Sequence, residues 1–156
     1  ILSIPVSVGT IVLGLPAGLA LGAAFGTVSA LSAFGIVGAP SALAAALVSA
    51  SPVLAILLCY VPRLLIPVFV YGTYHIATRK NAQSKRAISY AAAAGSLCNT
   101  VFYLGLMLLF YVILGINSES VLAAIGGTGL IAGGSEAIVA VLIVTPVTLA
   151  IQKIKK

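Results

Sequence analysis

Long apolar stretches separated by short polar segments run along most of this chain. Three of them, Val53–Ala77, Ile88–Ile116 and Val121–Ile151, exceed the roughly 20 residues that an α-helix needs to cross about 30 Å of hydrocarbon. Pro16–Ile36 is a fourth candidate span, whereas Ile1–Leu13 is too short to cross completely. The pattern predicts an all-α, polytopic membrane helix bundle, with residues 1–156 forming a single membrane-embedded domain.

Two further segments do not fit a membrane span. Gly38–Ser51 is rich in alanine and serine and is bounded by prolines, and Gly115–Gly134 is rich in glycine. We expect both on the outer side of the membrane, either as plain connecting loops or as a lid over the bundle.

A glycine repeat marks the fourth candidate span. Gly14, Gly18, Gly22 and Gly26 recur every four residues, which places them on one helix face and lets another helix approach closely. The repeat could serve packing inside the protein or a partner's helix, and we favour internal packing.

Composition strengthens the membrane interpretation and assigns an orientation. Hydrophobic residues make up 62% of the chain and charged residues only 6%, against about a quarter in soluble domains. Seven of the eight basic residues lie in segments 79–86 and 153–156. This is the positive-inside pattern, so we expect both segments on the cytoplasmic side of the cell membrane and no nucleic-acid partner.

The remaining reactive residues do not form an enzyme motif. Cys59 and Cys98 have no metal-ligand spacing and are expected to be small core residues. His75 is expected at the membrane interface. No Walker A, GxSxG or HExxH sequence is present, so we expect no catalytic residue, cofactor or metal, and any ATP hydrolysis must occur in another subunit.

Three strongly polar residues, Arg63, Asn99 and Glu136, lie alone within three of the apolar stretches. A charge at the centre of a membrane helix costs on the order of 2.5–3.5 kcal/mol on insertion scales, so such residues usually face a cavity or a partner. Helix rise places them ~24, ~20 and ~26 Å from the basic ends of their helices. This common depth predicts one polar pocket in the outer half of the bilayer.

The residue types in this pocket suit a small polar anion. Arg63 presents a fork of donors that matches a carboxylate or phosphate, and Asn99 both donates and accepts hydrogen bonds. Glu136 either accepts from ligand hydroxyls or balances the charge of Arg63. The other predicted ligand-binding residues are close neighbours of Arg63 or Asn99 along the chain: Tyr60, Thr100, Phe102 and Tyr103.

Structural roles remain open for the same residues. Arg63 and Glu136 form an internal ion pair in one alternative, with Asn99 bridging helices. In another, a helix begins at Gly133-Gly134-Ser135, and the Glu136 carboxylate stabilises its first turn through the helix dipole. We also expect the prolines on either side of Arg63, at positions 62 and 67, to free backbone carbonyls near the pocket.

Several short runs resemble the substrate-binding S components of energy-coupling factor (ECF) vitamin transporters, nearest to the pantothenate-type subunits. The early helices are similar in Ile4-Pro5-Val6 and in the glycine-containing run 14–26. The later helices are similar in Val61-Pro62-Arg63, in run 95–101 and in run 134–139. The resemblance covers essentially the whole chain, and its weight lies in the order and spacing of these pieces.

This resemblance implies six transmembrane helices, the first of which is missing from this chain together with its Ala-x-x-x-Ala motif. It implies capture of a water-soluble vitamin from outside, with pantothenate favoured, and docking on a membrane-embedded coupling subunit with two cytosolic ATPase subunits. Arg63 and Asn99 match positions that line the family's pocket. Glu136 matches less closely, because Gly133 and Gly134 stand where the family often has an asparagine.

Other functions remain open on the sequence. Within the family, the ligand could be another vitamin or a nucleobase-like compound. Outside it, the chain could be an ion-coupled secondary carrier with Glu136 as its proton site, or a structural assembly subunit that binds no small molecule. A carrier transports alone in liposomes, whereas an S component binds alone but imports only with its ATPase partners.

Overall fold

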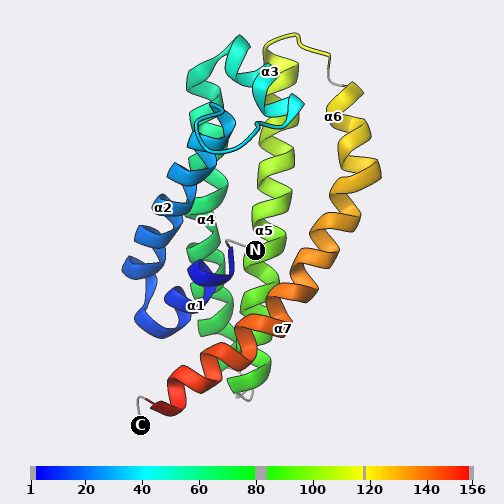
Figure 1. The fold of residues 1–156 in the computed structure, drawn as a ribbon. Coiled ribbons are helices and arrows are strands. Elements are labelled where there is room, and N and C mark those ends of the chain that lie inside the picture. The colour runs from blue at the N-terminus through cyan, green and yellow to red at the C-terminus, as the bar shows by residue number, and fades with distance from the viewer. Residues whose placement is uncertain (1–2, 80–83, 118, 155–156) are drawn as a thin grey trace.

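The computed structural model describes residues 3–79, 84–117 and 119–154, which are mostly helical (Figure 1). Four helices are long and apolar enough to cross a membrane: α2 (Leu15–Ala33), α4 (Pro52–Arg79), α5 (Ser84–Ile113) and α7 (Leu130–Ile154). The shorter helices are α1 (Ser3–Leu13), α3 (Ala42–Ala50) and α6 (Glu119–Ala124). The predicted all-α membrane helix bundle is confirmed, and each of the four predicted spans contains most of one long helix. The predicted span Val121–Ile151 also takes in part of α6 and a short π-helical turn before α7.

The long helices stand side by side in the order α2, α4, α5 and α7, and α1 packs against all four (Figure 1). Because α1 has only 11 residues, it fills one end of the bundle and begins at mid-height in Figure 1. Arg79 ends α4, Lys85 lies in the first turn of α5, and Lys153 lies in the last turn of α7. These ends gather opposite α3; residues 80–83 and 155–156 of the two basic segments lie outside the described residues, as do residues 1–2.

The chain reverses direction between α1 and α2 at a single residue. Gly14 has a φ of 94°, a conformation that glycine adopts without the steric cost of a side chain. Pro16 follows within the first turn of α2, where a missing N–H costs no helical hydrogen bond. Gly14 and Pro16 together account for the tight turn between α1 and α2.

The glycine repeat of α2 brings this helix against α4. Gly18, Gly22 and Gly26 are all buried. A methyl group added at Gly22 would lie 2.7 Å from the carbonyl oxygen of Arg63, and one at Gly26 would lie 2.8 Å from the ring of Tyr60. Both distances are shorter than van der Waals contact, so the last three glycines of the repeat serve internal packing, as favoured from the sequence. Gly14 lies in the turn before α2 and is not part of this helix face.

The two segments that the sequence leaves as loops are largely helical. In Gly38–Ser51, α3 begins after Ser41, whose Oγ accepts a hydrogen bond from the Ala44 N–H at 3.2 Å. In Gly115–Gly134, α6, a π-helical turn (Ile125–Gly129) and the start of α7 follow one another without a break. The expectation of a glycine-rich loop is wrong here, because backbone polar groups at membrane depth must be satisfied within the protein, which favours a helix.

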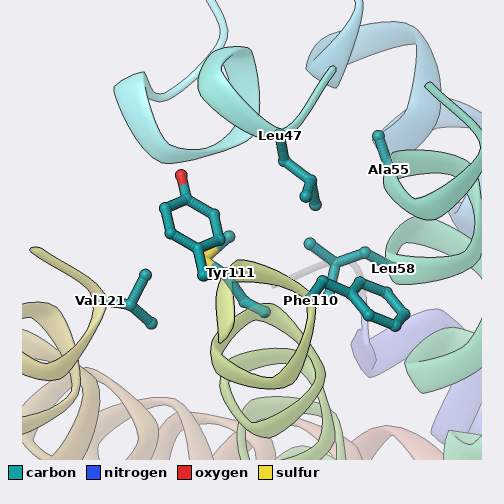
Figure 2. Packing of buried hydrophobic residues seen from close by; sticks show 7 residues of the cluster. Leu47, Ala55, Leu58, Phe110, Tyr111 and Val121 are labelled. Carbon is teal, nitrogen blue, oxygen red and sulfur yellow. The ribbon is translucent and has the colours of Figure 1, made fainter. Parts of the chain in front are cut away.

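Helix α3 lies across one end of the bundle and is held there by an apolar cluster (Figure 2). Leu47 points from α3 toward Leu58 of α4 and Phe110 of α5. The hydroxyl of Tyr111 on α5 donates a hydrogen bond to the carbonyl oxygen of Leu43 at 2.6 Å. This contact attaches α3 to the longest helix of the bundle.

Removing that hydroxyl should loosen α3. We expect Tyr111→Phe to lower the free energy of unfolding by about 0.5–1.5 kcal/mol, the net value of one hydrogen bond, and to speed amide hydrogen exchange in α3. Hydrogen exchange followed by mass spectrometry measures the local effect. Tyr90→Phe is the matched control, because Tyr90 lies on the same helix with 60% of its surface exposed. Equal exchange in both variants would contradict the attachment.

Candidate functional site

A proline in α4 determines how Arg63 is held. Pro62 has no N–H, so the carbonyl of Leu58, four residues earlier, loses its usual helical donor. Nη1 of Arg63 donates to this carbonyl oxygen at 3.0 Å. The sequence-based expectation that proline frees carbonyls beside Arg63 is therefore confirmed at Leu58, and this carbonyl fixes one side of the guanidinium.

Neutral groups surround the rest of the Arg63 side chain, which is only 7% exposed. Nη2 donates to Ser29 Oγ on α2 at 2.8 Å. The guanidinium carbon lies 4.6 Å from the ring centroid of Tyr103 and 5.3 Å from that of Phe25, within the range of cation–π attraction. Nε has no hydrogen-bond partner. The guanidinium is thus fixed in position, and one of its three nitrogens, Nε, makes no hydrogen bond.

Arg63 also forms no ion pair within the described part of the chain. The whole sequence contains only two acidic side chains, Glu119 and Glu136. Neither forms an ion pair with Arg63. The internal ion pair that the sequence left open is therefore absent. A buried charge without a charged partner in direct contact is costly, so this arrangement favours an external anion.

The three lone polar residues meet at one cavity. Arg63 from α4, Asn99 from α5 and Glu136 from α7 line a space of about 280 Å³, which we name the Arg63 cavity. Its other lining residues come from α5, the π-helical turn and the start of α7: Thr100, Tyr103, Leu104, Gly129, Ala132 and Gly133. Its volume is close to the lower limit of the roughly 300–1,000 Å³ found for small-molecule pockets.

Within this cavity a second polar group lacks a partner. The side-chain oxygen Oδ1 of Asn99 is buried and accepts no hydrogen bond. An unsatisfied donor and an unsatisfied acceptor therefore belong to two residues, Arg63 and Asn99, that line the same space. Further along α4, Ile66 and Val70 are fully buried in an apolar cluster with Val6 and Ala91.

Glu136 occupies a different setting from Arg63. It is the seventh residue of α7, which begins at Leu130, so its predicted role in stabilising a first helical turn is wrong. Its side chain is exposed, and it also lines a neighbouring space of about 270 Å³ with Ser3 of α1 and Ser135. Glu136 thus stands at the rim of the Arg63 cavity.

Two of the predicted site residues do not line the cavity. The hydroxyl of Tyr60 is 2.8 Å from Thr27 Oγ1 on α2, in hydrogen-bond contact. Phe102 is exposed and packs against Phe69, with ring centroids 5.8 Å apart. Thr100 and Tyr103 do line the cavity, as predicted.

Sequence reasoning missed Ser29 and Phe25, which contact Arg63 from α2. Part of the signal was present, because Ser29 lies seven residues after Gly22 and three after Gly26, on the face of the glycine repeat. A small polar residue that extends a buried glycine face is a candidate contact for the facing helix.

No protein-family model matches this chain, and no curated protein matches it. A function must therefore be inferred from the chemistry of the cavity and from the pattern of the sequence.

Proposed function

We propose that this chain is the membrane-embedded substrate-binding subunit, or S component, of an ECF-type ATP-driven importer, and that its ligand is a water-soluble vitamin, pantothenate above all. One observation carries the proposal: Arg63 lines the cavity and is buried, yet it forms no ion pair with a described acidic side chain, and its Nε makes no hydrogen bond. A ligand carboxylate supplies the missing counter-charge, and Arg matches its geometry with paired donors.

The other polar group of the cavity fits an amide. Asn99 Oδ1 lacks a donor, and the amide N–H of pantothenate is such a donor. Tyr103 gives the ligand an aromatic wall. Glu136, at the rim, accepts a hydrogen bond from a ligand hydroxyl as the ligand enters.

Orientation and partners follow from the same proposal. The basic ends of α4, α5 and α7 face the cytoplasm, so α3 and the Arg63 cavity lie toward the outside of the cell membrane. Because the sequence contains no ATP-binding motif, import requires a membrane-embedded coupling subunit and two cytosolic ATPase subunits. The chain itself binds ligand and performs no catalysis.

Calorimetry on the purified chain tests the ligand assignment. We expect pantothenate to bind, and panthenol, which has an alcohol in place of the carboxylate, to bind at least about 30-fold more weakly. This difference corresponds to about 2 kcal/mol, the lower end of the cost of leaving a buried charge unpaired. Equal affinity for the two compounds would contradict a carboxylate site at Arg63, and absence of binding to any water-soluble vitamin would overturn the proposal.

One observation favours the ion-coupled carrier as a second candidate. Glu136 is exposed and has no ion pair within the described residues, in a helix long enough to span a bilayer. Liposomes containing this chain alone separate the two functions. Pantothenate uptake driven by a proton gradient would identify a carrier, whereas binding without uptake supports the S component.

A further inference from the structure

A second cavity lies beneath α3. It has a volume of about 130 Å³ and is bounded by α2, α3, α4 and Tyr103 of α5. Three serine residues, at positions 29, 32 and 41, contribute to its wall. Apolar residues that include Ala44, Leu47 and Leu58 form much of the remainder. We name this space the α3 chamber.

The α3 chamber and the Arg63 cavity share a wall. Tyr103 lines both of them. Ser29 lines the chamber, and its Oγ accepts the hydrogen bond from Arg63, which lines the other cavity. The two spaces are therefore neighbours. The hydroxyl of Tyr103 makes no hydrogen bond to the described residues, and its ring contacts the Arg63 guanidinium.

The chamber has a mixed chemical character. Ser29 Oγ accepts a hydrogen bond from Arg63, and its own hydrogen is within hydrogen-bonding reach of the Cys59 thiol, which also lines the chamber. The side chain of Ser32 forms no hydrogen bond within the described residues, so it can also donate or accept there. The space equals about four water molecules at roughly 30 Å³ each, and thus suits a compact group. Serine hydroxyls and apolar alanine and leucine side chains line the same space, so the chamber fits a branched aliphatic group that carries hydroxyls.

We infer that the α3 chamber and the Arg63 cavity form one two-part site for an elongated ligand. The anionic end lies at Arg63, and the hydroxylated aliphatic end lies among the serines beneath α3, with Tyr103 between them. This inference rests on the proposed function, because pantothenate has a carboxylate at one end and a hydroxylated, branched aliphatic group at the other. It assigns the ligand hydroxyls of the bound state to Ser29 and Ser32 in place of Glu136.

Filling the chamber tests the inference. Ser32→Leu places a large side chain in the space, and we expect it to weaken pantothenate binding at least tenfold by calorimetry. Ser49→Leu makes the same substitution at an exposed position of α3 outside the chamber, where the affinity should stay within threefold of wild type. Melting temperatures of both variants show whether either one has lost its fold.

The two cysteines of the chain provide an independent readout. Cys59 lines the chamber, whereas Cys98 lines neither the chamber nor the Arg63 cavity. In a Cys98→Ala variant, we expect saturating pantothenate to slow the reaction of Cys59 with methyl methanethiosulfonate at least tenfold. In Cys59→Ala, the reaction of Cys98 should not change. These thiol measurements do not depend on the folding of a filled chamber.

The possible outcomes distinguish failure of the two-part site from failure of the proposed function. Pantothenate binding that leaves both the Cys59 reaction rate and the affinity of Ser32→Leu unchanged would overturn the two-part site while the proposed function stands. If the Cys59 thiol did not react with methyl methanethiosulfonate in the ligand-free protein, the chamber would not be accessible from outside, which would also contradict the two-part site. Failure of the wild-type chain to bind pantothenate would overturn the proposed function, and the two-part site with it.

Discussion

Arg63→Ala should remove most of the affinity for pantothenate, with a dissociation constant raised from about 30-fold to more than 1,000-fold. This range corresponds to about 2–5 kcal/mol, the cost of truncating one partner of a buried, hydrogen-bonded charge pair. The guanidinium suits this role because Leu58 and Ser29 already hold it in place. Calorimetry with wild type and variant measures the loss directly.

A cycle of variants and ligands makes this test specific. If Arg63 binds the carboxylate, the Arg63→Ala variant should bind pantothenate and panthenol with nearly equal affinity, because each change removes the same contact. Arg63→Lys keeps the charge without the planar fork and should recover only part of the affinity. Arg79→Ala, at the end of α4 away from the cavity, should bind as wild type does. If the affinity lost through Arg63→Ala and the affinity lost by replacing pantothenate with panthenol simply added, the carboxylate would bind elsewhere.

Most of the fold could be predicted from the sequence because length and hydropathy nearly determine a membrane helix. The spans agree with the helices to within a few residues at several ends, and the reversal at Gly14 follows from local chemistry. The region after Gly115 was harder to predict. Its glycines are typical of a loop in water, but a chain that continues directly into a membrane span has to satisfy its own backbone groups.

The sequence predicted that Arg63, Asn99 and Glu136 line one cavity, but it did not predict every side-chain direction. At about 100° per residue, Tyr103 lies about 40° from Asn99 on the side of Thr100, whereas Phe102 lies about 60° to the other side. The cavity is on the Thr100 side, so Tyr103 lines it and Phe102 faces outward. A single helix pattern does not reveal which side faces the bundle. Tyr60 was misplaced for a related reason, since its ring packs on α2, a pairing that depends on tertiary structure.

The close approach of α2 to Arg63 leads to the second large effect. A Cβ at Gly22 would lie 2.7 Å from the carbonyl oxygen of Arg63 and 3.4 Å from its carbonyl carbon. This oxygen has no helical donor, because Pro67 stands four residues later. A backbone atom cannot move aside as a flexible side chain can. We therefore expect Gly22→Ala to separate α2 from α4 and to lower the free energy of unfolding by about 1–3 kcal/mol.

The same substitution should weaken ligand binding, although Gly22 lines neither cavity. Moving α2 shifts Ser29 away from Arg63 and releases the guanidinium from its fixed position. Gly105→Ala is the matched control: it lies within α5, and an added methyl group there meets no atom within 4 Å. Alanine is a better helix former than glycine by up to about 1 kcal/mol, so this control should be neutral or stabilising. Thermal unfolding measures the stability of the two variants, and calorimetry measures their affinity for pantothenate. If Gly22→Ala matched Gly105→Ala in both measurements, Arg63 would not depend on α2 for its position.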